Sequence, residues 1–184
     1  EKVTSKGQKS NIILRDGSKI VLNSDTRVTY DKDFGLTNRN IKLTGEAYFE
    51  VAKNKDLPFN VVANNTTTTA IGTAFNITAF KGESSTAISL VSGKVKIFSI
   101  GKSDNTDSEV VLQPGQEYLV DENNEGAIVR SFDANKVISW KDNMLYFDNT
   151  RIQELILTLE RWYNVKVTVL NPEVMTDIRG TGQF

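Results

Sequence analysis

Short runs of β-forming residues, each broken by a turn signal, fill residues 11–130 and restrict the fold more than any other feature. In NIILRDGSKIVLN, the pair Asp16-Gly17 lies between two apolar runs, which is a strong β-hairpin signal. Ser92-Gly93 in ISLVSGKVKIF and Pro114-Gly115 in VVLQPGQEYLV predict further turns. Because helical periodicity is missing here, the sequence predicts a mainly β fold, an antiparallel β-sandwich or roll.

The segment KLTGEAYFEVA alternates apolar and polar residues with the period of a β-strand. The face expected to point inward consists of Leu43, Gly45, Ala47, Phe49 and Val51. The opposite face consists of Lys42, Thr44, Glu46, Tyr48 and Glu50. Along such a strand Glu46 and Glu50 lie about 13 Å apart, whereas glycosidases hold their two carboxyl groups about 5–9.5 Å apart. We interpret both as solvated carboxylates, so a glycosidase would need a carboxylate from an adjacent strand.

Near residue 140 the pattern changes to strand, helix and strand. A short strand is predicted at residues 144–147 and a second one at residues 165–170. Between them, Thr150 and Gln153 fit a helix capping box, and Asn164 favours a left-handed helix end. The apolar stripe expected to form a small core consists of Ile152, Leu155, Ile156, Leu159, Trp162 and Tyr163.

These patterns divide the 184 residues into two expected domains. Residues 1–138 form the predicted β domain, and residues 139–184 form the start of a small, partial α+β (βαβ) domain. DIRGTGQF reads as a last strand, and the small sheet looks unfinished at Phe184. We therefore expect the complete protein to continue beyond this residue.

Histidine and cysteine are both missing from the chain. Their absence removes Ser-His-Asp and Cys-His nucleophiles, zinc sites and disulfides. Two acidic loop clusters, Asp31 with Asp33 and Asp104 with Asp107 and Glu109, do not continue into a calcium-binding loop. We expect no metal and no cofactor.

The net charge is −1 and Lys and Arg form no run, which argues against a nucleic-acid partner. No apolar run approaches the roughly 18–20 residues that cross a bilayer, and EKVTSKGQKS is not a signal-like start. We expect no direct membrane contact by this segment. A secreted carbohydrate-binding β-sandwich module is an alternative function, with Tyr30, Phe34 and Tyr48 as an aromatic platform, although scattered aromatic residues support it weakly.

Several stretches resemble, in order, the periplasmic part of FecR-type anti-sigma regulators in the form common in Bacteroidetes. They are KGQKSNIILRDGSKIVLNSDTRVTY, LTGEAYFEVAKNKDLPFNV, IGTAFNITAF, LVSGKVKI and LQPGQEYLV. The ending WKDNMLYFDNTRIQELILTLERWYNVKV is similar to the start of their small C-terminal domain, which resembles the signalling domain of TonB-dependent transporters.

The resemblance implies the periplasmic region of a single-pass inner-membrane protein. Such a region receives a signal from the periplasmic signalling domain of a TonB-dependent outer-membrane transporter. The signal passes to an extracytoplasmic-function sigma factor, which is bound by a cytoplasmic segment. We expect that segment and the membrane helix to lie outside this chain.

The small C-terminal domain is the predicted partner-binding site, because an open sheet edge accepts a strand from another chain. The predicted contact residues on exposed helix positions are Arg151, Glu154 and Arg161. Those on the edge strand are Val165, Lys166, Val167, Thr168 and Val169. Trp162 is instead assigned to the core of the small domain.

The stretch IGTAF resembles the position where some family members cut their own chain at a Gly-Thr bond, which makes Gly72 and Thr73 candidates for self-cleavage. The Thr hydroxyl would attack the Gly carbonyl carbon and water would hydrolyse the resulting ester, which requires a twisted amide. In an unbroken strand Thr73 points inward, where its hydroxyl needs a hydrogen-bond partner. We favour a packing role with a β-bulge at Gly72, and we expect no enzymatic activity beyond this reaction.

Overall fold

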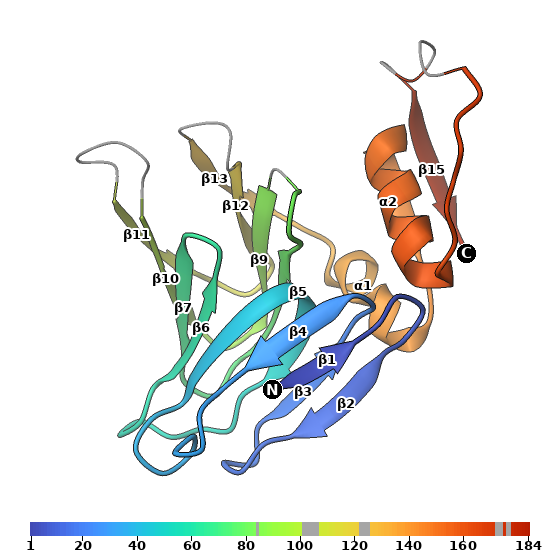
Figure 1. Cartoon of the computed structure of the whole chain (residues 1–184). Coiled ribbons are helices and arrows are strands. Elements are labelled where there is room, and N and C mark those ends of the chain that lie inside the picture. Colours follow the sequence, from blue (N-terminus) through green and yellow to red (C-terminus); the bar gives the residue numbers. More distant parts are fainter. Residues whose placement is uncertain (84, 101–106, 122–125, 172–174, 176–177) are drawn as a thin grey trace.

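The computed structural model describes residues 1–184 except 84, 101–106, 122–125, 172–174 and 176–177. In the described residues, thirteen strands form one strongly curled sheet (Figure 1). They are β1 (Lys2–Thr4), β2 (Ser10–Ile13), β3 (Lys19–Leu22), β4 (Thr26–Thr29), β5 (Asn40–Glu50), β6 (Phe59–Ala63), β7 (Thr66–Ala70), β8 (Ala74–Ala79), β9 (Ser85–Ser92), β10 (Val95–Ser99), β11 (Ser108–Leu112), β12 (Gln116–Asp121) and β13 (Ala127–Ser131). The mainly β prediction is therefore confirmed.

The curled sheet folds into two facing layers, which form a β-sandwich. Strand β5 belongs to both layers. Its first half pairs with β4 and, in parallel, with β6, whereas its second half pairs with β3 and β8. We call the layer of β1, β4, β6, β7, β10 and β11 sheet A, and the layer of β2, β3, β8, β9, β12 and β13 sheet B. The chain passes from one layer to the other near Gly45, which has a φ of 108°.

Hairpins from β6 to β13 alternate between the two sheets. β6–β7 and β10–β11 lie in sheet A, and β8–β9 and β12–β13 lie in sheet B. Each crossing between sheets contains a glycine with positive φ: Gly72 (65°), Gly93 (84°) and Gly115 (83°). A left-handed backbone is nearly free of strain only for glycine, which explains the turn signals at Ser92-Gly93 and Pro114-Gly115.

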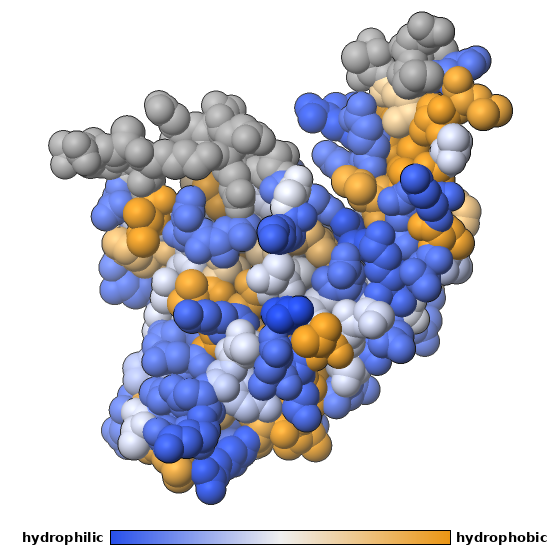
Figure 2. Space-filling model, viewed as in Figure 1, coloured by the Kyte–Doolittle hydropathy of each residue, from blue (hydrophilic) through white to orange (hydrophobic). Residues whose placement is uncertain are grey.

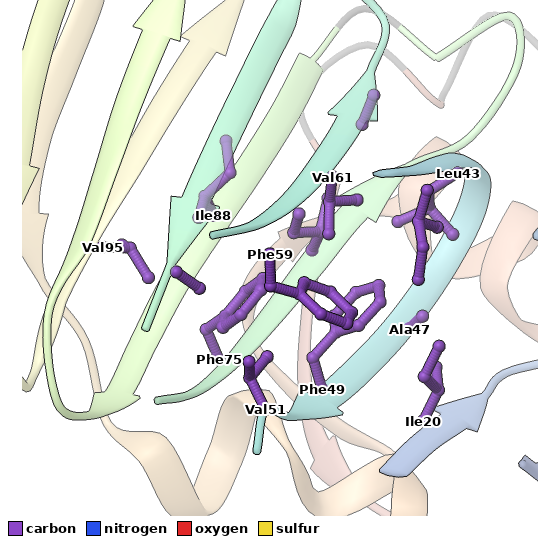
Figure 3. Close-up of a cluster of buried hydrophobic side chains, with 14 of the residues drawn as sticks. Ile20, Leu43, Ala47, Phe49, Val51, Phe59, Val61, Phe75, Ile88 and Val95 are labelled. Atoms are coloured by element: carbon purple, nitrogen blue, oxygen red, sulfur yellow. The ribbon is translucent and has the colours of Figure 1, made fainter. Parts of the chain in front are cut away.

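The core lies between the sheets and is rich in aromatic residues (Figure 3). Phe49 stacks on Phe75 with ring centroids 5.0 Å apart and meets the edge of Phe59 at 6.1 Å. The inward face predicted for β5 is buried, as expected. Tyr48 of the opposite face is also buried, because sheet B is covered on its outer side as well.

Beyond β13, the chain forms α1 (Ala134–Val137), the 3-10 helix η1 (Ser139–Asp142), β14 (Tyr146–Arg151), α2 (Ile152–Tyr163) and β15 (Arg179–Gln183). β14 and β15 pair antiparallel, and Leu145 and Phe184 extend the pair by exchanging backbone hydrogen bonds of 2.9 and 3.0 Å. The predicted boundary at residue 138 falls between α1 and η1. We call β14, α2, β15 and the segment that joins α2 to β15 the C-terminal unit.

Candidate functional site

The Gly72-Thr73 pair lies at the crossing from β7 to β8, whereas the sequence predicted a single strand with a β-bulge at Gly72. Gly72 adopts a left-handed conformation with a φ of 65°. Thr73 is buried as expected, and its carbonyl oxygen accepts a 2.9 Å hydrogen bond from the backbone N–H of Val51. The corner is therefore fixed to the end of β5.

Glycine at position 93 allows the second crossing to pack directly on this corner. A Cβ atom on Gly93 would lie 2.7 Å from Thr73 Cγ2 and 3.0 Å from the carbonyl oxygen of Gly72. Thr73 Oγ1 has no hydrogen-bond partner among the described atoms. Buried hydroxyls are rarely left unpaired, so this orphaned group is the unusual feature of the corner.

A shallow cavity of about 300 Å³ adjoins the corner. Its lining includes Thr73, Lys19 and the exposed residue Glu50. The corner thus holds a free hydroxyl, a left-handed glycine before it and nearby charged groups. These parts suit an acyl shift, and they equally suit a tightly packed turn.

The C-terminal unit differs from its prediction first in β14 and at the start of α2. The capping box is wrong: Arg151 is the N-cap of α2 and has no side-chain cap, while Thr150 is still in β14 and accepts a 3.2 Å hydrogen bond from the N–H of Asp148. The left-handed helix end at Asn164 is confirmed, with a φ of 52°. The predicted strand at residues 144–147 forms two residues later, as β14.

The second difference concerns residues 165–170, which form no strand. β15, further along the chain, takes the place beside β14 instead. Lys166 and Thr168 are exposed, and the N–H of Val167 donates a 2.8 Å hydrogen bond to Glu160 Oε1. Val165 is exposed and Val169 is half-buried, so this predicted contact segment is an extended loop beside α2.

The three helix positions that were predicted to contact a partner differ in their exposure to solvent. Arg151 and Glu154 are exposed, as expected, but Arg161 is largely buried against the β domain. Its guanidinium forms an ion pair with Glu83 and lies 3.8 Å from the ring centre of Phe80. The expectation that Arg161 is an exposed position is therefore wrong.

Trp162 also contacts the β domain, which the sequence did not indicate. Lys9 Nζ lies 3.5 Å from the Trp162 ring centre and donates hydrogen bonds to the carbonyl oxygen of Trp140 (2.6 Å) and to Asn143 Oδ1 (2.9 Å). The backbone N–H of Gly7 donates a 2.8 Å hydrogen bond to the carbonyl oxygen of Arg161. We call these contacts and the Arg161–Glu83 pair the junction.

Glu46 is not the solvated carboxylate expected on the polar face of β5, whereas Glu50 is exposed. Glu46 is half-buried and accepts hydrogen bonds from Asn23 Nδ2 (2.7 Å), Asn76 Nδ2 (2.9 Å) and Thr78 Oγ1 (3.0 Å). Burial raises the pKa of its carboxyl above the ordinary value, and the three hydrogen bonds only partly oppose this shift. Its hydrogen-bond partners are two amides and a hydroxyl.

Glu46 lies in a cleft of about 680 Å³ between sheet B and the C-terminal unit. The lining includes Arg130, Trp140, Tyr146, Leu157 and Arg161. Two buried atoms of this region, Trp140 Nε1 and Asn76 Oδ1, have no hydrogen-bond partner among the described atoms. The outer face of sheet B is therefore polar yet covered, a combination that strand alternation does not predict.

The residues considered for sugar binding or metal binding lie in the following places. Phe34 and Tyr48 are buried and Tyr30 packs against the core, so these aromatics form no exposed platform. Asp31 accepts hydrogen bonds from Asn38 and from the N–H of Asp33, and Asp104 lies outside the described residues. Within the described part of the chain, no three His, Cys, Asp or Glu residues are grouped for a metal, and no helix is long and apolar enough to cross a membrane.

Comparison with known proteins covers nearly the whole chain. Residues 1–96 match the family described as FecR protein, and residues 144–184 match the family described as FecR, C-terminal. No curated protein matches the chain. A crystal structure assigned as an anti-sigma factor from Parabacteroides distasonis is similar over 100% of this chain and 83% of its own, with 30% identity and a TM-score of 0.89. A second crystal structure of the same description, from the same organism, is similar over 99% and 82%, with 30% identity and a TM-score of 0.88.

Proposed function

Because this chain belongs to the FecR family and is an anti-sigma regulator of that kind, we propose that it is the periplasmic sensing region of a single-pass inner-membrane protein. It relays a signal from a TonB-dependent outer-membrane transporter to an extracytoplasmic-function sigma factor. The transporter contributes its periplasmic signalling domain as the direct partner. The sigma factor is bound by a segment outside this chain.

The observation that carries this proposal is the junction. Arg151, Glu154, Lys166 and Thr168 of the C-terminal unit are exposed to solvent. The unit is held to the β domain by Lys9, Gly7 and Glu83. A partner that binds the exposed residues therefore acts on a unit whose position is coupled to the β domain. Such coupling is what a relay needs.

Several large hydrophobic residues of the C-terminal unit are exposed to solvent. Figure 2 shows hydrophobic residues gathered on this unit. The exposed large hydrophobic residues are Leu157, Tyr163, Val165, Leu170, Ile178 and Phe184. In α2, no side chain is fully buried. Exposed hydrophobic residues that gather on one surface are typical of protein–protein contacts.

The test is a paired substitution in the exposed segment after α2. Lys166→Glu with Thr168→Glu reverses a charge and adds another where both side chains are exposed. Lys42→Glu with Thr44→Glu is the matched control, because it makes the same change on exposed positions of β5. Titration with the periplasmic signalling domains of the organism's own transporters is expected to show at least tenfold weaker binding for the first pair alone. Equal affinities of both pairs and the unchanged chain would contradict the proposed contact.

Self-cleavage at Gly72-Thr73 is a second candidate, favoured by the unpaired Thr73 hydroxyl and the left-handed Gly72. In this reaction Thr73 Oγ1 bonds to the Gly72 carbonyl carbon while the C–N bond breaks and the nitrogen takes a proton. Water then hydrolyses the ester and leaves two chains. Electrophoresis of the purified chain after long incubation tests it, and a single intact band argues against it.

A further inference from the structure

β13 is the last strand of sheet B, and its outer edge is free in the described residues. It pairs with β12 through five successive residues without a register shift. On its other side no described strand pairs with it, and all five residues are exposed. The backbone N–H and C=O groups that point away from β12 are therefore available to another strand.

Among the described residues, β13 has little of the usual protection of an edge strand. Edges are normally protected by charges, prolines, bulges or covering segments. The one charged residue of β13, Arg130, donates a 2.7 Å hydrogen bond from Nε to Glu117 Oε2 of β12, and its Nη2 forms an ion pair with the same oxygen at 2.6 Å. Because Glu117 is buried and opposite in charge, Arg130 gives little repulsion toward an incoming strand.

The core is also incomplete at this edge. Val129 pairs with Tyr118 in register, so its side chain lies on the core face beside a buried residue, yet Val129 is 44% exposed. Val110 and Val120 pack against the core and are only partly buried. A further strand with an apolar residue beside Val129 would cover this end of the core.

We propose that β13 pairs antiparallel with β13 of a second copy of this chain, around a two-fold axis at Val129. This arrangement places Val129 beside its own copy, and Ala127 opposite Ser131, on the core face. On the outer face Ile128 lies opposite Arg130, so no like charges face each other. The edge is thus complementary to itself, as a two-fold interface requires.

Five paired residues make a small contact, at the low end of interface sizes. The expected dimer is therefore weak and concentration-dependent. Sedimentation equilibrium between about 1 μM and 1 mM, the range of weak affinities, is expected to show the mass rising from 20.5 kDa toward twice that value. A mass that stays at one chain over the whole range would overturn the proposal.

A charge on the core face of the edge is expected to prevent the pairing. Val129→Lys places a lysine beside its own copy at the two-fold axis, and the variant is expected to remain a single chain. Ile13→Lys is the matched control, because Ile13 is 75% exposed on β2, the opposite edge of sheet B. Association that persists in Val129→Lys, or that Ile13→Lys alone abolishes, would overturn the proposal; circular dichroism confirms that both variants fold.

The absence of cysteine gives a second test that does not weaken the edge. Cα atoms directly opposite in an antiparallel pair lie about 4.5–5.5 Å apart, within the range that a disulfide spans. Val129→Cys is therefore expected to form a covalent dimer under oxidation. The two copies of Ile128 lie about 8 Å apart by the strand geometry, so Ile128→Cys is expected to form far less, and equal yields would contradict the two-fold register.

Discussion

The backbone N–H of Gly7 donates a 2.8 Å hydrogen bond to the carbonyl oxygen of Arg161. The last carbonyl groups of a helix have no partner within the helix, and here the loop between β1 and β2 supplies one. The end of α2 is therefore held by the N-terminal strands. Lys9, which contacts Trp140 and Trp162, strengthens the same connection.

Arg161→Ala is expected to loosen the C-terminal unit. The variant loses a largely buried ion pair with Glu83 and the contact with Phe80, together worth about 2 kcal/mol. Hydrogen exchange of the α2 amides is expected to become roughly 30-fold faster. Arg151→Ala, at an exposed position of the same unit, is the control; equal exchange in both variants would show that the junction does not hold α2.

Gly93→Ala is expected to destabilise the protein far more than Gly115→Ala. Both residues have a left-handed φ near 84°, which costs alanine about 1–2 kcal/mol. Only at Gly93 does the new Cβ overlap a neighbour, Thr73 Cγ2 at 2.7 Å, while nothing lies within 4 Å at Gly115. Urea unfolding is expected to give a loss of about 3 kcal/mol or more for Gly93→Ala. Equal losses would mean that the two crossings do not pack as described.

Thr73→Val separates packing from self-cleavage. Removing a buried hydroxyl that has no partner is expected to raise the free energy of unfolding by about 1 kcal/mol. Thr68→Val is the matched control, because Thr68 Oγ1 is also buried and unpaired among the described atoms. If the wild-type chain cuts itself, the fragments disappear in Thr73→Val and persist in Thr68→Val. Fragments that remain in Thr73→Val would exclude this hydroxyl as the nucleophile.

The raised pKa of Glu46 makes stability depend on pH. The folded state binds this proton more tightly than the unfolded chain does, so the stabilising contribution is complete below the ordinary value of 4.5. It is lost as the pH rises through the raised pKa, and each pH unit between the two pKa values changes the free energy of unfolding by roughly 1.4 kcal/mol. Relative to that of the wild type, the free energy of unfolding of Glu46→Gln is therefore expected to rise between pH 4 and pH 8.

The control for this dependence is Glu50→Gln, at an exposed position of the same strand. Its difference from wild type is expected to stay nearly constant over the same pH range. A difference for Glu46→Gln that is equally constant would contradict the role given to burial.

Local patterns in the sequence predicted local structure well. Asp16-Gly17 predicted the β2–β3 hairpin, and alternation in KLTGEAYFEVA predicted the core face of β5, because both depend only on neighbouring residues. Asn164 predicted the end of α2 for the same reason. The capping box was wrong because β14 continues into Thr150, where pairing with Gly180 sets the backbone conformation.

Contacts between distant segments were not predictable in this way. The partner strand of β14 is β15 and not residues 165–170, and β-propensity does not say which strand pairs with which. Arg161 was expected to be exposed because it lies off the apolar stripe of α2, yet Glu83 and Phe80 cover it from another part of the chain. The burial of Glu46 and the contacts of Lys9 were not predicted, because a polar residue in a strand or loop gives no signal that a later segment will cover it.

Strand β5 makes the two sheets share one backbone. Residues Asn40 to Thr44 pair within sheet A and Gly45 to Glu50 within sheet B, and a Cβ on Gly45 would lie 2.5 Å from Thr26 Oγ1. Because β5 is a central strand of both sheets, its loss from one sheet would also disrupt the other. The sandwich is therefore expected to unfold in one cooperative transition, and a substitution at Gly45 would weaken both layers at once rather than release one of them.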